Sequence, residues 1–200
     1  MSTHYYCENH EPETVTLQDG RTVQIRAVCK TDGQLEKRLF ESLSPESRRD
    51  RFLGGSHKVS KKLLSLLTEN DHDTHEALIA VADADTDPKA VGVAHYACDP
   101  GGHSCECAVV VADDWQHHGL GSLLLERLTE IATHHGLDQM YSIDSAENHG
   151  QEHLAKALGF QCTADPRDYT LLTYSKYLHP DYLVTRQAAQ QTAQEGRLHS

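Results

Sequence analysis

Long apolar runs and a basic leader are both missing from this sequence. Its first residues, MSTHYYCENHEPE, have neither the positive start nor the apolar segment of a signal peptide, and no later stretch reaches the roughly 18 apolar residues that a membrane-spanning helix needs. Six scattered cysteines in 200 residues are too few for a disulfide scaffold. We therefore expect a cytoplasmic protein that keeps its thiols reduced and has no membrane partner.

Basic residues are scarce as well. The chain has 18 Lys and Arg against 30 Asp and Glu, which gives a formal net charge of -12. A nucleic-acid-binding surface needs clustered Lys and Arg, so we expect no nucleic-acid partner. A basic or polyamine-like partner suits an acidic chain better, although net charge alone does not choose a substrate.

The length of 200 residues fits one domain. We expect this domain at 15–178, after a polar N-terminal tail at 1–14. The Gln- and Ala-rich segment at 179–200 has little to bury and is expected to be a C-terminal tail, either helical or disordered. The sequence does not indicate an oligomeric state.

Hydrophobic periodicity predicts an α/β fold. Alternation around Asp19-Gly20 indicates a hairpin, and helical spacing then indicates three short helices. A meander of antiparallel strands follows, and after it a helix, a strand, a helix and two closing strands. The expected segments are a hairpin at 15–28, helices from 31, from 44 and from 60, strands at 77–83, 89–97 and 103–111, a helix at 120–136, a strand at 138–144, a helix ending at 159, and strands at 160–164 and 168–178. Together they predict a sandwich built on a mixed sheet.

A polar turn with two glycines, QHHGLGS (116–122), separates the apolar strand CECAVVV from a leucine-rich helix. The first N–H groups of that helix have no partner within it, and the aligned peptide dipoles add partial positive charge there. Gly119 and Gly121 let the backbone approach an anion closely, and Ser122 adds a hydroxyl. Neither the Rossmann nor the P-loop pattern is present. The turn therefore predicts a site for a pyrophosphate.

Two spaced motifs resemble those of the GCN5-related N-acetyltransferases, the GNAT superfamily. The strand AVVV followed by Gln116-x-x-Gly119-x-Gly121 is similar to their acetyl-CoA-binding motif, Q/R-x-x-G-x-G/A. The segment ENHGQEHLAKALGF (147–160) is similar to their second motif, E-N-x-x-A-x-x-L-Y-x-x-x-G-F. Over roughly 15–177 the chain resembles the acetyltransferase domain of bacterial Pat-type protein lysine acetyltransferases. This resemblance implies a mixed, mostly antiparallel twisted sheet flanked by helices.

Direct acetyl transfer to an amine requires a base, because a lysine amine with a pKa of about 10.4 arrives charged. Glu106 is the only carboxylate on the strand that leads to the turn, and alternation puts it on one face with Ala108 and Val110. A Glu at this strand position is taken as the general base in Pat-type enzymes, and the resemblance gives that role to Glu106. The alternative is a strand carboxylate paired with a Lys or Arg.

The resemblance also implies acetyl-CoA as co-substrate, no metal, and a set of cofactor-binding residues. The end of the strand would offer backbone groups to the pantetheine and the thioester, and the turn would hold the pyrophosphate. The implied residues are Val109, Val110, Val111, Gln116, His117, His118, Gly119, Leu120, Gly121, Ser122 and Asn148.

Two positions of the second motif depart from the family pattern, and a third has two possible roles. Ala155 stands where many family members have a Tyr that protonates the departing thiolate, a departure that Pat-type sequences commonly share. Gln151 replaces the usual small or Met residue. Asn148 matches the motif Asn that contacts pantetheine, but it is also suited to cap the helix that follows; the two roles can coexist.

Other chemistries fit the sequence less well. His103, Cys105 and Cys107 share one strand face but span about 13 Å, too far for one zinc ion. A Cys nucleophile has no identifiable His or Asp partner. We therefore expect an N-acetyltransferase acting on protein lysines; the alternatives are a small amine or polyamine acceptor, or a regulatory module that binds acetyl-CoA without transfer. The charge run SRRDRF (47–52) either lines the acceptor side or is a solvated helix face.

Overall fold

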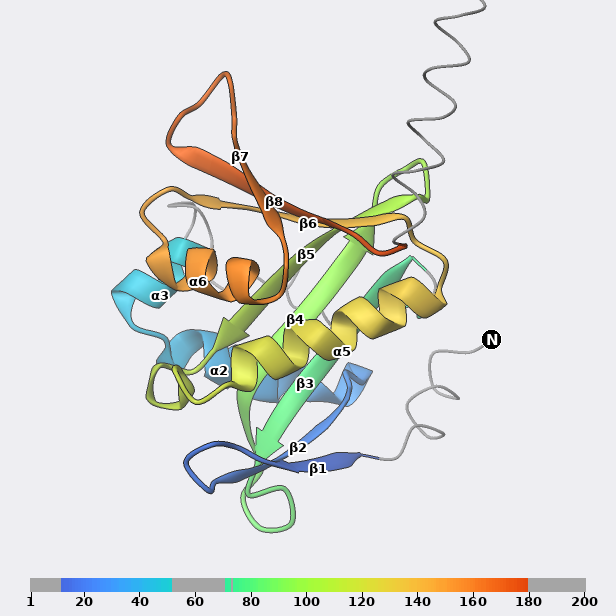
Figure 1. Cartoon of the computed structure of the whole chain (residues 1–200). Helices are drawn as coiled ribbons and strands as arrows, with labels where there is room; N and C mark the ends of the chain where they lie inside the picture. Colours follow the sequence, from blue (N-terminus) through green and yellow to red (C-terminus); the bar gives the residue numbers. More distant parts are fainter. Residues whose placement is uncertain (1–11, 52–70, 73, 180–200) are drawn as a thin grey trace, which may run out of the picture.

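One mixed sheet organises the molecule. The computed structural model describes residues 12–51, 71–72 and 74–179, and within them eight strands pair in the order β1-β2-β3-β4-β5-β6-β8-β7 (Figure 1). Every neighbouring pair is antiparallel except β5 and β6, which are parallel. The α/β class and the mixed, mostly antiparallel sheet are confirmed.

The elements follow the predicted order closely. The strands are β1 (Glu13–Thr16), β2 (Thr22–Ala27), β3 (His75–Ala82), β4 (Lys89–Cys98), β5 (Ser104–Val111), β6 (Gln139–Ser145), β7 (Gln161–Ala164) and β8 (Leu171–Tyr177). The helices are α2 (Gly33–Ser42), α3 (Pro45–Arg51), α5 (Leu120–His134) and α6 (His149–Ala157). Strand β1 begins inside the segment expected to be the N-terminal tail. The helix expected from Ser60 and the rest of both tails lie outside the described residues.

Local sequence signals account for the N-terminal part. The turn between β1 and β2 closes with a hydrogen bond from Leu17 N to Arg21 O (2.8 Å), and Gly20 has a φ of +87° there. Helix α3 begins at Pro45, and the Ser44 hydroxyl accepts a hydrogen bond from Ser47 N (3.1 Å). Serine is favoured as the N-cap of a helix and proline at its first position, so these two residues account for the start of α3.

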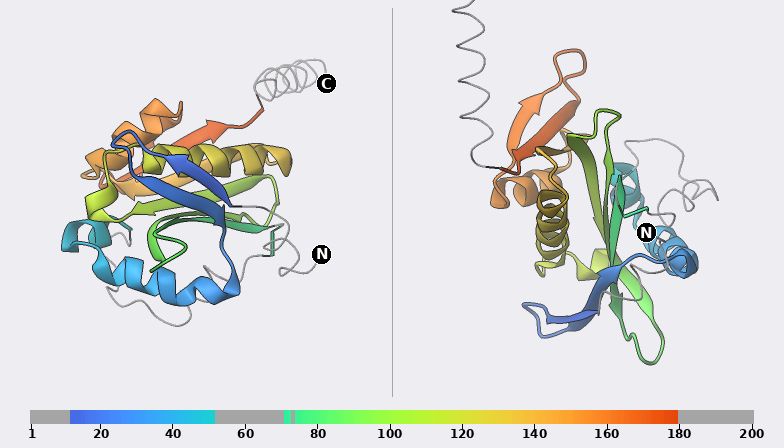
Figure 2. Two further views of the ribbon diagram at one scale, coloured as in Figure 1. Left: turned by 90° about the horizontal axis from the view of Figure 1, so that it is seen from below. Right: turned by 90° about the vertical axis from the view of Figure 1, so that its right-hand side faces the viewer.

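The helices cover both faces of the sheet. Figure 2 shows α5 and α6 on one face and α2 and α3 on the other. Leucines of α5 pack on β3, β4 and β5, and they come close because β4 has Gly92: a Cβ there would lie 2.8 Å from Leu124 Cδ1. On the other face, Leu39 and Phe40 of α2 are buried against β3 and β4.

The parallel pair is short. Strand β5 pairs with β6 only at Ser104, Cys105 and Glu106, although both strands continue beyond this register. Figure 1 shows the two strands diverging past that point. We call residues 107–111 of β5 and 142–145 of β6 the β5–β6 split. Because these backbone edges do not pair with each other, the split is a place inside the described sheet, between two central strands, where a ligand could bond to strand backbone.

Candidate active site

The turn after β5 brings the predicted anion-binding residues to one end of the split. A 3-10 turn (Asp113–Trp115) follows β5, and Gly119 then caps α5 in the left-handed conformation, with φ +87°. His117 also has a positive φ of 63°. The first N–H groups of α5, from Leu120, Gly121 and Ser122, have no acceptor within the helix. The backbone is therefore arranged to receive an anion.

Gln116 fastens this turn to the rest of the site. Its Nε2 donates to Val111 O (3.1 Å) and to Ser47 Oγ (3.1 Å), and the Ser47 hydroxyl donates to Asp113 Oδ1 (2.7 Å). The carbonyl oxygen of Val111 thus accepts the bond from Gln116, and Val109 and Val110 come before it on the same strand. The side chain of Gln116 thus links the end of β5 to α3.

The β1–β2 hairpin supports the same turn from the other side. The guanidinium of Arg21 lies 3.9 Å from the centroid of the Trp115 ring and donates to Asp114 O (3.1 Å). His118 Nδ1 lies 3.4 Å from Asp19 Oδ2, while His117 is exposed. His118 therefore faces a carboxylate of the hairpin, which sequence reasoning did not anticipate.

Glu106 occupies the last paired position before the split. It is partnered in register with Tyr141 of β6, and its side chain is exposed on the face that carries α2 and α3. Within the described residues it forms no ion pair with a Lys, Arg or His. Arg51 of α3 does interact with Glu106 electrostatically, as the alternative of a strand carboxylate near a basic partner expects.

Charged groups from three other elements surround this point. Burial lowers the pKa of Arg51, on α3, while Asp144, Glu106 and Glu36 raise it. Arg51 Nη2 lies 3.3 Å from His95 Nε2. Burial, and next Arg51, lowers the pKa of His95 to about 3, so this imidazole is neutral and Nε2 accepts from the guanidinium.

The start of α6 is linked to strand β6 by hydrogen bonds. Asn148 Oδ1 accepts a hydrogen bond from Gln151 N (2.9 Å), which confirms the capping role. Gln151 Nε2 donates to Ser142 Oγ (3.2 Å), and this hydroxyl donates to Asp144 Oδ2 (2.8 Å). The unusual glutamine is therefore explained by a hydrogen-bonded chain that ends in the split. Ala155 is buried and offers no proton donor.

His103, Cys105 and Cys107 differ in their surroundings. His103 precedes β5 and lies 3.5 Å from Asp138, whereas Cys105 and Cys107 are buried on the α5 side. Burial raises the pKa of Cys105 to about 12 and that of Cys107 well above its usual range, which disfavours the thiolate that a ligand or nucleophile needs. Across the described residues no group of three or more His, Cys, Asp or Glu is arranged to hold a metal ion.

Sequence reasoning missed Arg51, His95 and Asp144. Arg51 was present in the charge run SRRDRF, and it interacts electrostatically with Asp144 and Glu106, whereas Arg48 of the same run donates to Leu43 O and Glu41 O at the end of α2. His95 meets Arg51 across 44 residues of chain, and Asp144 lies on β6, which pairs with β5 and β8 and not with a neighbouring strand in sequence, so no local pattern marks either residue.

Comparisons with known proteins agree with this geometry. The model of the acetyltransferase (GNAT) family matches residues 38–160. Acetyltransferase PA5475 of Pseudomonas aeruginosa is 40% identical over 157 residues, which is 78% of this chain and 83% of that protein. No helix among the described residues is long and apolar enough to cross a membrane.

Solved structures share the fold. The GNAT domain of S. lividans PAT superposes with a TM-score of 0.76 at 20% identity, covering 88% of this chain and 99% of that one. The putative acetyltransferase yncA of Salmonella typhimurium, solved with its cofactor acetyl-CoA, superposes with a TM-score of 0.61 at 18% identity, covering 79% and 95%. GNAT enzymes use acetyl-CoA, as that structure illustrates. With a family match over more than half of its length and a close relative over most of it, this chain belongs to the GNAT family and is an acetyltransferase.

Proposed function

We propose that this enzyme transfers the acetyl group of acetyl-CoA directly to the amine of a lysine side chain in a protein, with Glu106 as the general base. One observation carries the proposal. Glu106 is the last residue of β5 that pairs with β6, and the strand then runs along the split to the glycine-capped start of α5. Base and anion site are thus joined by a strand edge of a few residues.

In this reaction the residues of the chain deprotonate the acceptor amine and stabilise the thioester oxygen. Glu106 takes a proton from the acceptor ammonium, directly or through one water, and the free amine attacks the thioester carbon. A backbone N–H in 109–111 stabilises the carbonyl oxygen as it gains charge. Ala155 provides no acid, so the thiolate leaves without a proton from that position.

The residues around the turn fit the cofactor that the family uses. The N–H groups of 119–122 would bind the pyrophosphate, with Ser122 adding a hydroxyl, and Asn148 would contact the pantetheine. A Cβ at Gly121 would make only ordinary contacts, 3.6 Å to Val111 and 3.8 Å to Leu154, so packing does not require this glycine. Close approach of backbone to an anion remains as its role.

Several features bear on the acceptor. The sequence resemblance to Pat-type protein lysine acetyltransferases supports a protein lysine. The net charge of -12 supports any cationic amine, including a polyamine. The expected alternative of a module that binds acetyl-CoA without transfer is set aside, because the chain belongs to an acetyltransferase family. The proposal also includes a catalytic domain at 15–178, with tails on either side of it, and a cytoplasmic location.

A transfer assay chooses among these acceptors. The purified protein receives acetyl-CoA with a labelled acetyl group, beside a lysate of deacetylated proteins and, in parallel, a panel of small amines. We expect label on lysines of proteins, lost when Glu106→Gln replaces the wild type. Label on a small amine alone would show that the acceptor is that amine and not a protein lysine. Binding of acetyl-CoA without any transfer would contradict the proposal as a whole.

A further inference from the structure

We infer that Cys98 and Cys105 form a disulfide when the protein meets a small-molecule disulfide such as oxidised glutathione. The two residues lie opposite each other in the antiparallel ladder of β4 and β5, and both carry thiols in the structure. Cys105 directly precedes Glu106 on β5, so this covalent modification falls beside the proposed base. The inference does not depend on the acetyl transfer.

The hydrogen bonds around the two cysteines identify the type of pair that they form. Cys98 N donates to Thr74 O (2.8 Å), which lies on the side of β3. One residue further along, Asp99 N donates across the hairpin to Ser104 O (2.8 Å). Hydrogen-bonded and non-hydrogen-bonded pairs alternate in an antiparallel ladder, so Cys98 and Cys105 are a non-hydrogen-bonded pair.

This type of pair suits a disulfide. The Cα atoms of a non-hydrogen-bonded pair are about 4.5 Å apart, closer than those of a hydrogen-bonded pair. A disulfide spans Cα distances of about 4.4–6.8 Å. The bond can therefore form between β4 and β5 without moving the strands apart.

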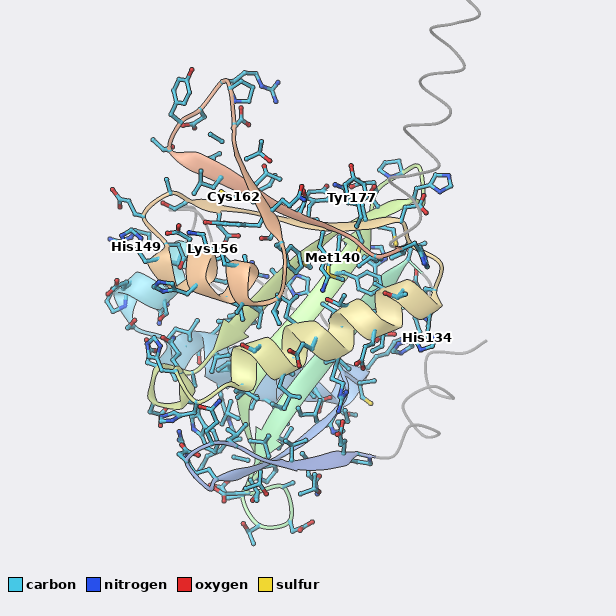
Figure 3. The ribbon with its side chains drawn as sticks, in the orientation of Figure 1. His134, Met140, His149, Lys156, Cys162 and Tyr177 are labelled. Carbon is cyan, nitrogen blue, oxygen red and sulfur yellow. The ribbon has the colours of Figure 1, made fainter. Side chains whose placement is uncertain are left out.

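Both side chains lie on the face of the sheet that carries α5. Cys105 is buried in the apolar cluster that includes the leucines of α5, and Cys98 packs against the same cluster. Met140 of β6, the register partner of Cys105, marks this face, and Figure 3 shows it directed toward α5, where Thr129 Oγ1 lies 3.7 Å from its sulfur. The two thiols therefore meet on one face of the sheet.

The hairpin turn keeps the two cysteines in register. Residues 99–103 join the strands, and Gly102 has a φ of +70° and donates to Asp99 O (2.8 Å). A short turn of fixed geometry specifies the register of its hairpin. The sulfur atoms are thus held near each other, which favours an intramolecular reaction over a second encounter with a small thiol.

Exposure determines which thiol reacts first. Cys98 is partly exposed, whereas Cys105 has no exposed surface and burial raises its pKa to about 12. The Cys98 thiolate attacks one sulfur of the small disulfide, which gives a mixed disulfide and releases one small thiolate. That thiolate takes up the proton that Cys98 had lost to water.

The buried thiol completes the exchange. The sulfur of Cys105 attacks the Cys98 sulfur of the mixed disulfide, and the proton of Cys105 goes to the second departing thiolate. In sum, two cysteine thiols and one small disulfide become one protein disulfide and two small thiols. In a reducing compartment such a bond is transient, as redox-sensing disulfides are.

The test follows the thiols of the full-length protein by mass spectrometry. The protein is incubated with oxidised glutathione, the remaining thiols are alkylated, and proteolytic cleavage before Asp99 then separates Cys98 from Cys105. The variants are Cys98→Ala and Cys105→Ala. Cys107→Ala is the matched control, because Cys107 lies on the same strand and face as Cys105 but has Tyr96 as its register partner.

We expect the wild type to give a linked pair of peptides that contains Cys98 and Cys105, and a reducing agent to separate them. Both alanine variants lose the linked pair, and Cys107→Ala keeps it. In Cys105→Ala the mixed disulfide cannot resolve, so Cys98 retains glutathione, as does the exposed Cys162 that Figure 3 shows on β7.

Three results would overturn the inference. They are glutathione retained on Cys98 of the wild type, both thiols alkylated after the treatment, and a linked pair that survives Cys105→Ala. The peptides of the wild type decide the question even where a variant fails to fold.

Discussion

At the scale of single residues, burial sets the charge of side chains near the split. Glu36 of α2 has no exposed surface, and neither carboxylate oxygen accepts a hydrogen bond within the described residues. Burial, and next Asp32, raises the pKa of Glu36 to about 7, while Arg51 lowers it. The folded protein therefore keeps this carboxyl protonated at pH values where the unfolded chain has lost the proton.

This predicts a pH-dependent effect of Glu36→Gln. A raised folded-state pKa gives a contribution to stability that is present below the unfolded value of 4.5 and is lost as pH rises to about 7. Glutamine has no charge to bury, so the variant should gain roughly 2–3 kcal/mol relative to the wild type at about pH 8 and much less at about pH 5.

Urea denaturation at the two pH values measures the difference. Glu41→Gln is the matched control, because Glu41 is an exposed carboxylate of the same helix, 3.8 Å from Lys37. An equal offset at both pH values for Glu36→Gln would show that the carboxyl does not titrate between them.

At the scale of elements, the turn before α5 depends on backbone geometry. Gly119 has a φ of +87°, and Gly136, beyond the other end of the same helix, has +76°. Both angles are strained for a residue with a Cβ, by about 1–2 kcal/mol. Only Gly119 belongs to the proposed anion site, so the two positions separate strain from binding.

We predict that Gly119→Ala and Gly136→Ala destabilise the fold similarly, by about 1 kcal/mol. Only Gly119→Ala should weaken acetyl-CoA binding, by about tenfold or more, since the N–H groups of α5 would shift. Isothermal titration with acetyl-CoA, beside thermal unfolding of both variants, gives the two quantities. Equal affinity in both variants would remove the turn from the cofactor site.

The elements and the turn could be predicted from sequence because their signals are local. Apolar alternation marks β3, β4 and β5, and the leucine stripe marks α5. The early divergence of β5 from β6 could not, since it depends on how far two strands, separated by a helix, remain in register. The link from Gln151 through Ser142 to Asp144 depends on that same packing, so the sequence showed only an unexplained glutamine.

At the scale of the whole molecule, the net charge of -12 should act on the acceptor over a distance. An acidic field raises the local concentration of cations and their rate of encounter, and salt screens it. We therefore predict that kcat/KM for a cationic acceptor falls severalfold between about 50 and about 300 mM NaCl. Steady-state kinetics with n-butylamine and with 2,2-difluorobutylamine, whose amine is largely uncharged at the assay pH, provide the comparison. A decrease that is the same for both amines would refute electrostatic attraction.

The central claim is that Glu106, at the end of the paired part of β5, is the base of an acetyl transfer from acetyl-CoA to an amine. The most direct measurement combines kcat with the Kd for acetyl-CoA in the wild type and in Glu106→Gln. We predict that kcat falls by about 100-fold to 10,000-fold, because the ammonium then has no base, while the Kd stays within about twofold. A kcat within a few-fold of the wild type, or a Kd that weakens in step with kcat, would contradict this assignment.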